Sequence, residues 1–464
     1  MTNWLPRKEA LSTPLHASLA SQIARAIEAG ELLEGDRLPP HRVLASSLGL
    51  SVHTVSKAYD SLRRQNLIDG KVGRGSFVLH PGKADDQPFD LEPNRRGGFD
   101  LSISRPVYST LHVKRMQRVL KSLHKELDPA TYLALRPNAG LPEHREAAKA
   151  WLSQCGLEAD TGSIIITNGV SHGMSAALSA LARQGDVVLT DMVTHHLTVS
   201  ASAYFGLKLV GVAADSDGLL PDALEAACAQ KRAKVLFLLA NATNPKAYVM
   251  PAERRAELVR IARKHDLYII ENDAYGPIIE NAPPPVSALA PERSVYLTTL
   301  SKCTVSGLRI GYMVAPPHVF PTLLGRHMAY GWMAPGLLAE IASTWVRDGT
   351  AMEMALWQRE QMRVRHEILR EGLGGFDVSG CETGLHVWLT LPDGWTSERF
   401  VRYAAKFNVT VAPEASFLTA DAGPQNAVRL SKGSTFEVGD FEQAVTNIAR
   451  LLERPDDPLP LASF

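Results

Sequence analysis

The chain has little cysteine and no long apolar run. Its four cysteines among 464 residues lie too far apart for a disulfide framework or a metal site. The longest nearly apolar stretch, residues 329–346, contains Pro335 and Glu340, so it does not predict a membrane span. The first ten residues include charged side chains and lack the apolar core of a signal peptide. These absences predict a cytoplasmic protein with reduced thiols, no bound metal and no membrane partner.

The net charge is zero, with 49 basic and 49 acidic residues, but positive charge is concentrated near the beginning of the chain. Residues 37–80 hold seven lysines and arginines against two aspartates. Such a local excess indicates a polyanionic partner, although a solvated surface can also carry it.

The first eighty residues predict three short helices. Apolar residues recur every fourth position over residues 15–27, and Pro39-Pro40 opens a second helix. Gly49 gives the turn into a third helix, which Ser51 caps. This is the helix-turn-helix plan, in which the outward residues at the start of the last helix contact bases. The inward residues of that helix are Val55, Tyr59 and Leu62, and the outward ones are Val52, His53, Thr54, Ser56 and Lys57.

Residues 67–78 predict two strands around a glycine-rich tip, a hairpin that can reach the minor groove or the phosphates beside it. Residues 38–78 carry Leu-Pro-x-x-Arg-x-Leu-Ala, then Leu-Gly-Leu-Ser-x-x-Thr-Val-x-x-Ala-Tyr and Gly-Arg-Gly-Ser-Phe-Val, and so resemble the winged helix-turn-helix of the GntR regulators. A small oligomerisation module is the alternative. The family usually has an arginine where this chain has Val52, so the operator sequence does not carry over. The resemblance implies DNA contacts from Arg42, His53, Thr54, Lys57, Arg74 and Gly75.

Residues 80–99 are rich in proline, glycine and charge and predict a linker. We therefore predict a DNA-binding domain over residues 1–79 and a larger domain over residues 100–464. In the larger domain short apolar strands alternate with helical patterns, which predicts an α/β fold with a mostly parallel sheet. The expected strands are Ile164–Thr167, Val187–Leu189, Leu207–Val212, Val235–Leu238, Tyr268–Ile270 and Val295–Thr298.

The segment from Thr299 to Tyr312 is the most informative of the chain. It reads Thr-x-Ser-Lys with Gly-Leu-Arg-x-Gly close behind, between two apolar strands. Pyridoxal 5'-phosphate needs this set, because Lys302 can form a Schiff base with its aldehyde. The hydroxyls of Thr299 and Ser301 can donate to the phosphate, and Arg309 can hold it with two hydrogen bonds.

Three other strands also end in polar residues, at the edge where ligands of parallel sheets gather. Gly169, Val170 and Ser171 follow the first strand and can aim backbone N–H groups at a phosphate. Asp273 can hold the pyridine nitrogen protonated, and Tyr275 and Asn244 can bind the ring oxygen from two sides. Each alone fits a structural role, whereas the set together points to the cofactor.

Residues 100–455 resemble the fold-type I aminotransferases, and the whole chain resembles the MocR regulators, which join a GntR head to such a body. The resemblance implies that Arg429 grips the carboxylate of an effector, although an ordinary strand arginine is the alternative. It places the residue that stacks on the pyridine ring near His195. Lys246 follows Asn244-Pro245 where the family usually has threonine, and it is either an effector contact or a surface lysine. The residues implied to bind the cofactor are Lys302, Asp273, Tyr275, Asn244, Arg309, Thr299, Ser301, Gly169, Val170, Ser171 and His195.

The leading interpretation is a transcription regulator, preferably a repressor, that binds a double-stranded DNA operator as a homodimer, with its subunits head to tail. It senses a primary amine, which forms an external aldimine and releases Lys302. The alternative is an active aminotransferase that also binds DNA. Overall likeness indicates the branch that controls ectoine and hydroxyectoine use. Ectoine has no primary amine, so a ring-opened diaminobutyrate derivative is expected, with GABA- or taurine-type effectors as competitors.

Overall fold

The structure, a computed structural model, describes residues 4–6, 8, 11–29, 31–33, 35–64, 67–71, 75–78, 98–433 and 437–453. By its contacts the chain separates into two compact units, Met1–Pro88 and Phe89–Phe464. Nearly all of the predicted linker, residues 80–97, lies outside the described residues. The predicted domain boundaries therefore remain predictions.

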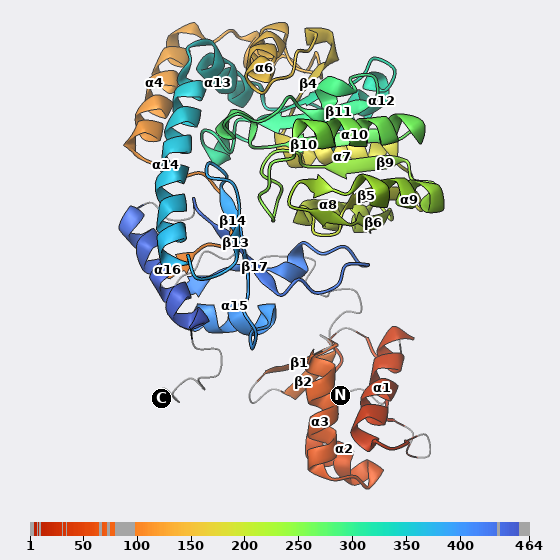
Figure 1. Cartoon of the computed structure of the whole chain (residues 1–464). Coiled ribbons are helices and arrows are strands. Elements are labelled where there is room, and N and C mark those ends of the chain that lie inside the picture. Colours follow the sequence, from red (N-terminus) through yellow and green to blue (C-terminus); the bar gives the residue numbers. More distant parts are fainter. Residues whose placement is uncertain are drawn as a thin grey trace. The chain divides into compact units, whose positions relative to one another are not determined.

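The first unit is a winged helix-turn-helix (Figure 1). The turn before the third helix uses Gly49 at φ +67°, a left-handed conformation that favours glycine. The Ser51 hydroxyl accepts a hydrogen bond from the Thr54 amide at 3.1 Å, as an N-cap does. Tyr59 is fully buried, and its hydroxyl donates to the Pro39 carbonyl at 2.8 Å. The elements are α1 (Leu15–Glu28), α2 (His41–Leu48), α3 (Val52–Arg64), β1 (Ile68–Lys71) and β2 (Gly75–Val78), and the two strands pair antiparallel.

The second unit is built on a seven-stranded sheet in the order β4-β12-β11-β10-β9-β5-β6. Only β12 runs against its neighbours, so the predicted mostly parallel α/β sheet is confirmed. The strands are β4 (Ile164–Thr167), β5 (Val187–Asp191), β6 (Lys208–Val212), β9 (Val235–Leu238), β10 (Tyr268–Asp273), β11 (Ser294–Thr299) and β12 (Gly311–Val314).

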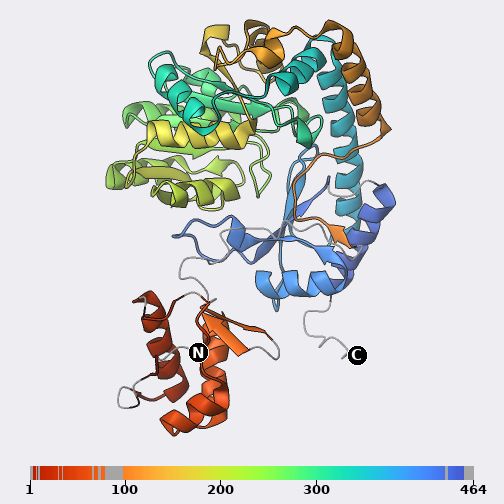
Figure 2. The same cartoon turned by 180° about the vertical axis from the view of Figure 1, so that it is seen from behind.

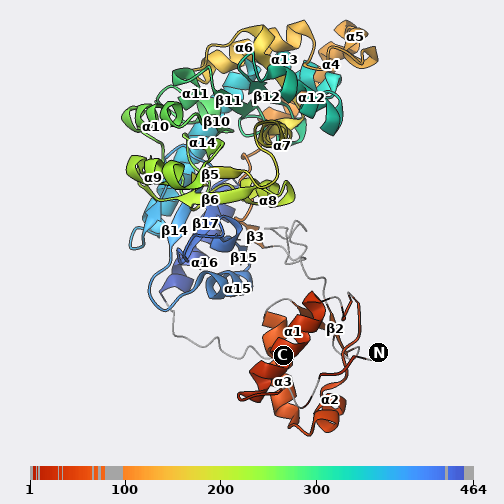
Figure 3. The same cartoon turned by 90° about the vertical axis from the view of Figure 1, so that its right-hand side faces the viewer.

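Helices cover both faces of this sheet, which Figure 3 shows edge-on. Neighbouring strand residues face opposite layers: Ile270 packs with α7 and Ile269 packs with α10. Figure 2 shows α7, in yellow, lying across its face. One face carries α7 (Gly169–Leu181), α8 (His196–Tyr204) and α12 (Phe320–Gly331), and the other carries α9 (Pro221–Lys231), α10 (Ala252–Lys264) and α11 (Val286–Leu289).

A second core joins the sheet to further helices, and a third core lies under a small antiparallel sheet ordered β13-β14-β17-β16. The long helix α14 contributes to both cores. These helices are α4 (Thr110–Glu126), α5 (Ala130–Leu133), α6 (Pro142–Gln154), α13 (Gly336–Arg347), α14 (Thr350–Gly372), α15 (Ser397–Lys406) and α16 (Val438–Leu452). The remaining strands are β3 (Phe99–Asp100), β7 (Ala214–Asp215), β8 (Gly218–Leu219), β13 (Val378–Ser379), β14 (His386–Thr390), β15 (Val409–Thr410), β16 (Ala412–Pro413) and β17 (Ala427–Ser431).

Residues 99–105, called here the entry strap, bring the chain into the second unit. Their strand β3 pairs parallel with β15, and the Leu101 amide donates to the Thr410 carbonyl at 2.8 Å. The Leu101 carbonyl accepts from the Ser431 amide at 2.8 Å. The strap is therefore held by backbone hydrogen bonds both to β15 and to β17 of the small sheet. Within the described part of the chain, none of the helices has the length and apolarity needed to cross a bilayer.

Candidate functional site

A cavity of about 260 Å³ lies beyond the carboxyl ends of β9, β10 and β11. This is the edge at which parallel sheets bind ligands. Its walls come from the strand ends, the start of α7 and α8, the entry strap and β17. The lining residues are Ile103, Ser104, Val170, Ser171, His195, His196, Leu197, Leu239, Asn244, Asn272, Ala274, Tyr275, Thr299, Ser301, Lys302, Arg309 and Arg429.

Lys302 follows β11 and reaches into this cavity, where its Nζ donates to the Ser104 carbonyl of the entry strap. Burial, together with the positive charges of Arg429 and Arg309, lowers the pKa of the Lys302 amine to about 8. A lowered pKa leaves more of the amine unprotonated near neutral pH than an exposed lysine would have. The amine is therefore prepared for attack on an aldehyde.

One end of the cavity has the groups that can hold an anion such as a phosphate. Gly169 begins α7 at φ +78°, and a Cβ there would lie 2.7 Å from Nη2 of Arg309. Glycine thus lets the arginine come close to the helix start, where free N–H groups favour an anion. Thr299 and Ser301 lie beside it, but the Thr299 hydroxyl donates to the Ile310 carbonyl at 2.6 Å. Its proton is therefore already engaged, whereas Ser301 needs only to rotate its hydroxyl toward the phosphate.

The opposite wall carries Tyr275 and Asn244. The Tyr275 hydroxyl lies 3.5 Å from Nδ1 of His386, and burial raises the pKa of the phenol, so it is a donor at neutral pH. Asn244 Oδ1 accepts a hydrogen bond from Nη1 of Arg429 at 2.8 Å. Two donors, a phenol O–H and an amide N–H, are thus available to a ring oxygen.

His195 lines the cavity at the start of α8, with its ring centroid 4.5 Å from that of His196. Burial, with the positive charges of Lys302 and Arg429 nearby, lowers the pKa of His195 to about 3. The ring is therefore neutral at pH 7. A neutral ring is suited to stack on a pyridine ring here, because two cations already lie nearby.

Arg429 is almost fully buried in β17, and its guanidinium lies 4.9 Å from the centre of the Phe417 ring. Its Nη2 donates to the carbonyl of Ser102 in the entry strap. Burial lowers the pKa of Arg429 to about 10, so the side chain keeps its charge at neutral pH. It presents a fixed cation to the same cavity that receives Lys302.

The prediction that the Asp273 side chain faces the cofactor is wrong, because this side chain points away from the cavity. Its two carboxylate oxygens accept from the Tyr296 hydroxyl at 2.6 Å and the Gly276 amide at 3.1 Å, away from the cavity. Its neighbour Asn272 lines the cavity in its place. Side chains alternate across a strand, so a shift of one residue reverses the face. Because β10 is apolar on both faces, the sequence pattern alone does not tell Asn272 from Asp273.

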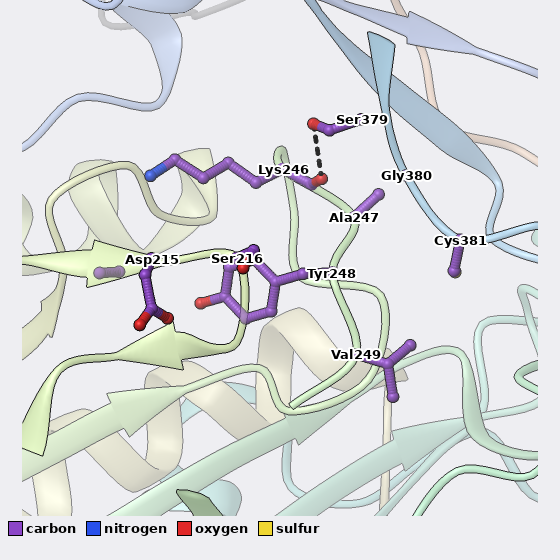
Figure 4. Close-up of a pocket in the computed structure, with 10 residues that line it drawn as sticks. Asp215, Ser216, Lys246, Ala247, Tyr248, Val249, Ser379, Gly380 and Cys381 are labelled. Atoms are coloured by element: carbon purple, nitrogen blue, oxygen red, sulfur yellow. Dashed lines mark hydrogen bonds between the residues drawn. The ribbon is translucent and has the colours of Figure 1, made fainter. Parts of the chain in front are cut away.

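Lys246 also lies elsewhere than expected for an effector contact. It does not line the cavity of Lys302, and its Nζ is 3.9 Å from Oδ1 of Asp191. It lines a separate, wider depression with Asp215, Tyr248 and Ser379 (Figure 4). There the Ser379 hydroxyl donates to the Lys246 carbonyl at 3.5 Å. The Lys246 side chain is directed toward Asp191 and this depression, so motif position did not predict side-chain direction.

In the first unit the predicted DNA-contacting residues lie at the start of α3 and around it. Arg42, His53 and Lys57 are exposed, and Thr54 is half-buried beside its cap. Gly75 is exposed at φ +104°, where a Cβ would lie 2.8 Å from Nε of Arg37. Arg74 lies outside the described residues.

The residues around the cavity fit pyridoxal phosphate. A desolvated lysine, an anion cradle that a Cβ at Gly169 would fill, and buried polar atoms without partners at Asn272 and His195 occur together. Residues that sequence reasoning missed are Asn272, His196 and the strap residues Ile103 and Ser104. Among the described residues no group of histidine, cysteine and acidic side chains is arranged to hold a metal ion.

Comparisons with known proteins agree with this geometry. Residues 96–448 match the family model "Aminotransferase class I and II", and residues 15–78 match "Bacterial regulatory proteins, gntR family". The HTH-type transcriptional regulator YdeF of Bacillus subtilis is 26% identical over 97% of both chains. The regulator YjiR of Escherichia coli is 26% identical over 89% of this chain and 93% of its own.

Solved structures show the same fold for the second unit. An archaeal alanine:glyoxylate aminotransferase has a TM-score of 0.71 and 27% identity over 77% of this chain and 91% of its own. LysN, an α-aminoadipate aminotransferase of Thermus thermophilus solved with N-(5'-phosphopyridoxyl)-L-leucine, has a TM-score of 0.70 and 22% identity. It covers 78% of this chain and 93% of its own.

Proposed function

Because this chain belongs to the class I and II aminotransferase family and carries a gntR-family domain ahead of it, the MocR-type architecture, we propose a ligand-sensing transcription regulator. It binds operator DNA through the first unit. It responds to a small primary amine through pyridoxal phosphate held in the second. The favoured outcome is repression that the amine relieves, in the cytoplasm.

One observation carries the proposal: the two residues that an amino acid would engage both hold the entry strap. Lys302 donates to the Ser104 carbonyl, and Arg429 donates to the Ser102 carbonyl. These contacts are two residues apart on the strap. In the resting holo-protein the cofactor would engage the Lys302 amine, and an effector would free that amine while its carboxylate engages Arg429. Both side-chain anchors of the strap therefore change together.

Pyridoxal phosphate, when bound, supplies an aldehyde carbon that condenses with one primary amine at a time. Lys302 would provide that amine in the resting protein, and an effector amine would take its place. Gly169, Val170, Ser171, Ser301 and Arg309 hold the phosphate, and Tyr275 and Asn244 hold the ring oxygen. His195 supports the ring face. Arg429 receives the effector carboxylate, because its guanidinium already faces the cavity and offers paired donors.

The strap gives the signal a route through the chain. It directly follows the segment that joins the two units, and its first residues are fixed by the backbone pairing of β3 with β15. A change of the anchors at Ser102 and Ser104 changes the restraint on that segment and hence on the DNA-binding unit. The effector shifts the equilibrium only by its different affinity for the two strap positions.

The chemistry of the cavity restricts the effector to a molecule with a primary amine and an acid group. A ring-opened diaminobutyrate derivative from ectoine or hydroxyectoine meets this requirement, and intact ectoine does not. GABA- and taurine-type amines also meet it and are the competitors.

A homodimer with its subunits head to tail is part of the proposal, and an exposed apolar band supports it. Leu135 is 72% and Tyr204 is 86% exposed. The Trp332 indole donates to the Leu135 carbonyl at 3.0 Å, and the exposed Tyr330 packs near Phe205. Large exposed apolar patches mark interfaces. Sedimentation equilibrium of the full chain should give twice the monomer mass, and a monomer would contradict this part.

The deciding experiment measures the hydrogen exchange of the entry strap and the release of DNA in the same samples. The holo-protein is bound to an operator duplex selected from a random library, then titrated with 2,4-diaminobutyrate, GABA and taurine. One amine should release the DNA and accelerate hydrogen exchange at the Leu101 amide. A secondary amine of similar shape should do neither. Steady turnover with a 2-oxo acid acceptor, without any change in DNA affinity, would favour the alternative, an aminotransferase with a DNA-binding head.

A further inference from the structure

The cavity contains three cations and no acid. Lys302, Arg309 and Arg429 line it, and no aspartate or glutamate does, within the part of the chain that the structure describes. Asn272 occupies the strand position that would face the ring. It is 2% exposed, and its Oδ1 atom is buried without a hydrogen-bond partner, so no hydrogen bond to that oxygen fixes the amide and its Nδ2 can turn toward the ring.

The position of Asn272 is fixed by the sheet. In the parallel pairing of β10 and β11 it lies opposite Leu297, which packs in the core under α7 together with Ile270. Asn272 is thus on the α7 face, where the phosphate cradle begins. Asp273 faces the other side, and its carboxylate is already held by Tyr296 and Gly276.

An amide and a carboxylate do different things to a pyridine nitrogen. A carboxylate stabilises the protonated, positively charged nitrogen as an ion pair and raises its pKa by about one to three units. An amide carries no charge, and its N–H donates to the lone pair of the unprotonated nitrogen. In a cavity with three cations already present, a fourth positive charge without a counterion is strongly disfavoured.

We propose that Asn272 keeps the pyridine nitrogen of the cofactor unprotonated by donating an amide hydrogen to it. The site then exchanges amines but suppresses transfer of the amino group. Transfer requires that the amine-bearing carbon lose a proton and that the aldehyde-derived carbon gain one. A protonated ring nitrogen accepts the electron pair between these two events, and a neutral one accepts it poorly. This inference rests on the proposed function and explains how a sensor avoids consuming its effector.

The direct test needs no variant. The full chain is loaded with ¹⁵N-labelled pyridoxal phosphate, and the pyridine nitrogen shift is measured by NMR between pH 6 and 8. The shift of an unprotonated nitrogen is expected throughout. The shift of a protonated nitrogen in the wild-type protein would overturn the proposal.

Asn272→Asp provides the second arm. It should move the ¹⁵N shift toward the protonated value and raise the single-turnover conversion of L-alanine to pyruvate by about tenfold or more, in line with the rise in protonated fraction. Asp273→Asn, on the opposite face, should leave the ¹⁵N shift unchanged. Conversion by the wild type as fast as by a folded Asn272→Asp protein would also overturn it. If the aspartate variant does not fold, the wild-type spectrum alone decides.

DNA release is scored separately in the same preparations. A wild type with an unprotonated nitrogen that ignores every amine in the operator assay would refute the sensing function and leave the role of Asn272 intact. If amines release the DNA from a protein whose pyridine nitrogen is protonated, the sensing function stands and the proposed role of Asn272 is refuted.

Discussion

Arg429 donates from Nη1 to Oδ1 of Asn244 at 2.8 Å, a contact that joins the small antiparallel sheet to the loop after β9 of the large sheet. Asn244 also lines the cavity, so the hydrogen bond fixes the orientation of both side chains at once. A ligand carboxylate that binds Arg429 therefore also affects the amide that faces the ring oxygen. Effector binding and cofactor binding share this hydrogen bond.

The first prediction concerns Arg429. Arg429→Lys keeps a positive charge but loses the paired donors, so the effector concentration for half-maximal DNA release should rise about tenfold or more, and further in Arg429→Ala. Operator affinity without effector should hold in Arg429→Lys, which keeps a donor for the Ser102 carbonyl, and should shift toward the effector-bound value in Arg429→Ala, which loses that anchor. Arg399→Lys is the matched control, because Arg399 is also stacked on an aromatic ring, 4.9 Å over Trp395, but lies outside the cavity. An unchanged titration in Arg429→Ala would remove this residue from effector recognition.

The second prediction concerns pH. The pKa of Lys302 is lowered to about 8, so its amine is mostly protonated below pH 8 and mostly free above it. The rate at which the apo-protein forms its yellow adduct with pyridoxal phosphate should therefore rise with pH and level off above an inflection near 8. Arg429→Gln removes one neighbouring positive charge and should move the inflection upward. An inflection above pH 10 would mean that the amine is not desolvated, and Lys302→Ala should form no adduct.

The third prediction tests the entry strap. A Cβ at Gly433 would lie 1.8 Å from the Arg105 carbonyl oxygen, so Gly433→Ala must push the strap away. Hydrogen exchange at the Leu101 amide should accelerate, and the free energy of unfolding should fall by about 1–3 kcal/mol. Gly439→Ala is the control, because a Cβ there meets nothing within 4 Å. DNA affinity should shift toward the value of the effector-bound protein, and an unchanged affinity with a displaced strap would exclude the strap as the route.

The fourth prediction concerns the DNA-binding unit. Arg42→Ala and Lys57→Ala each remove an exposed charge close to the start of α3. Each should weaken operator binding and reduce the slope of log K against log salt by about one. Lys231→Ala, an exposed lysine in α9 of the other unit, should change neither. Equal slopes in all three variants would show that these head residues do not contact phosphates.

Strand identity followed directly from sequence, because buried parallel strands such as Val235–Leu238 form short apolar runs between helices. The Thr-x-Ser-Lys segment was equally informative, because its residues follow one strand and are close together in the sequence. Their proximity can be predicted without knowing any contact between distant parts of the chain. Which of Asn272 and Asp273 faces the cavity could not be predicted. Both faces of β10 are buried, so its sequence does not alternate between apolar and polar residues. The strap was missed for another reason: Ser102 and Ser104 act through backbone carbonyls, which every residue type possesses.

The antiparallel direction of β12 fixes the number of residues that can lie between Lys302 and Arg309. The strand β11 ends at the cavity, whereas the antiparallel β12 begins there, so Lys302 and Arg309 enter from the two ends of one tight connection. Cys303 and Leu308, within that connection, are packed in the core. Addition or removal of a single residue there would separate the anion cradle from the amine. This interval should therefore tolerate substitutions at its less buried positions, Ser306 and Gly307, but no change in length. A scan of one-residue insertions would define the part of the chain that cannot be lengthened.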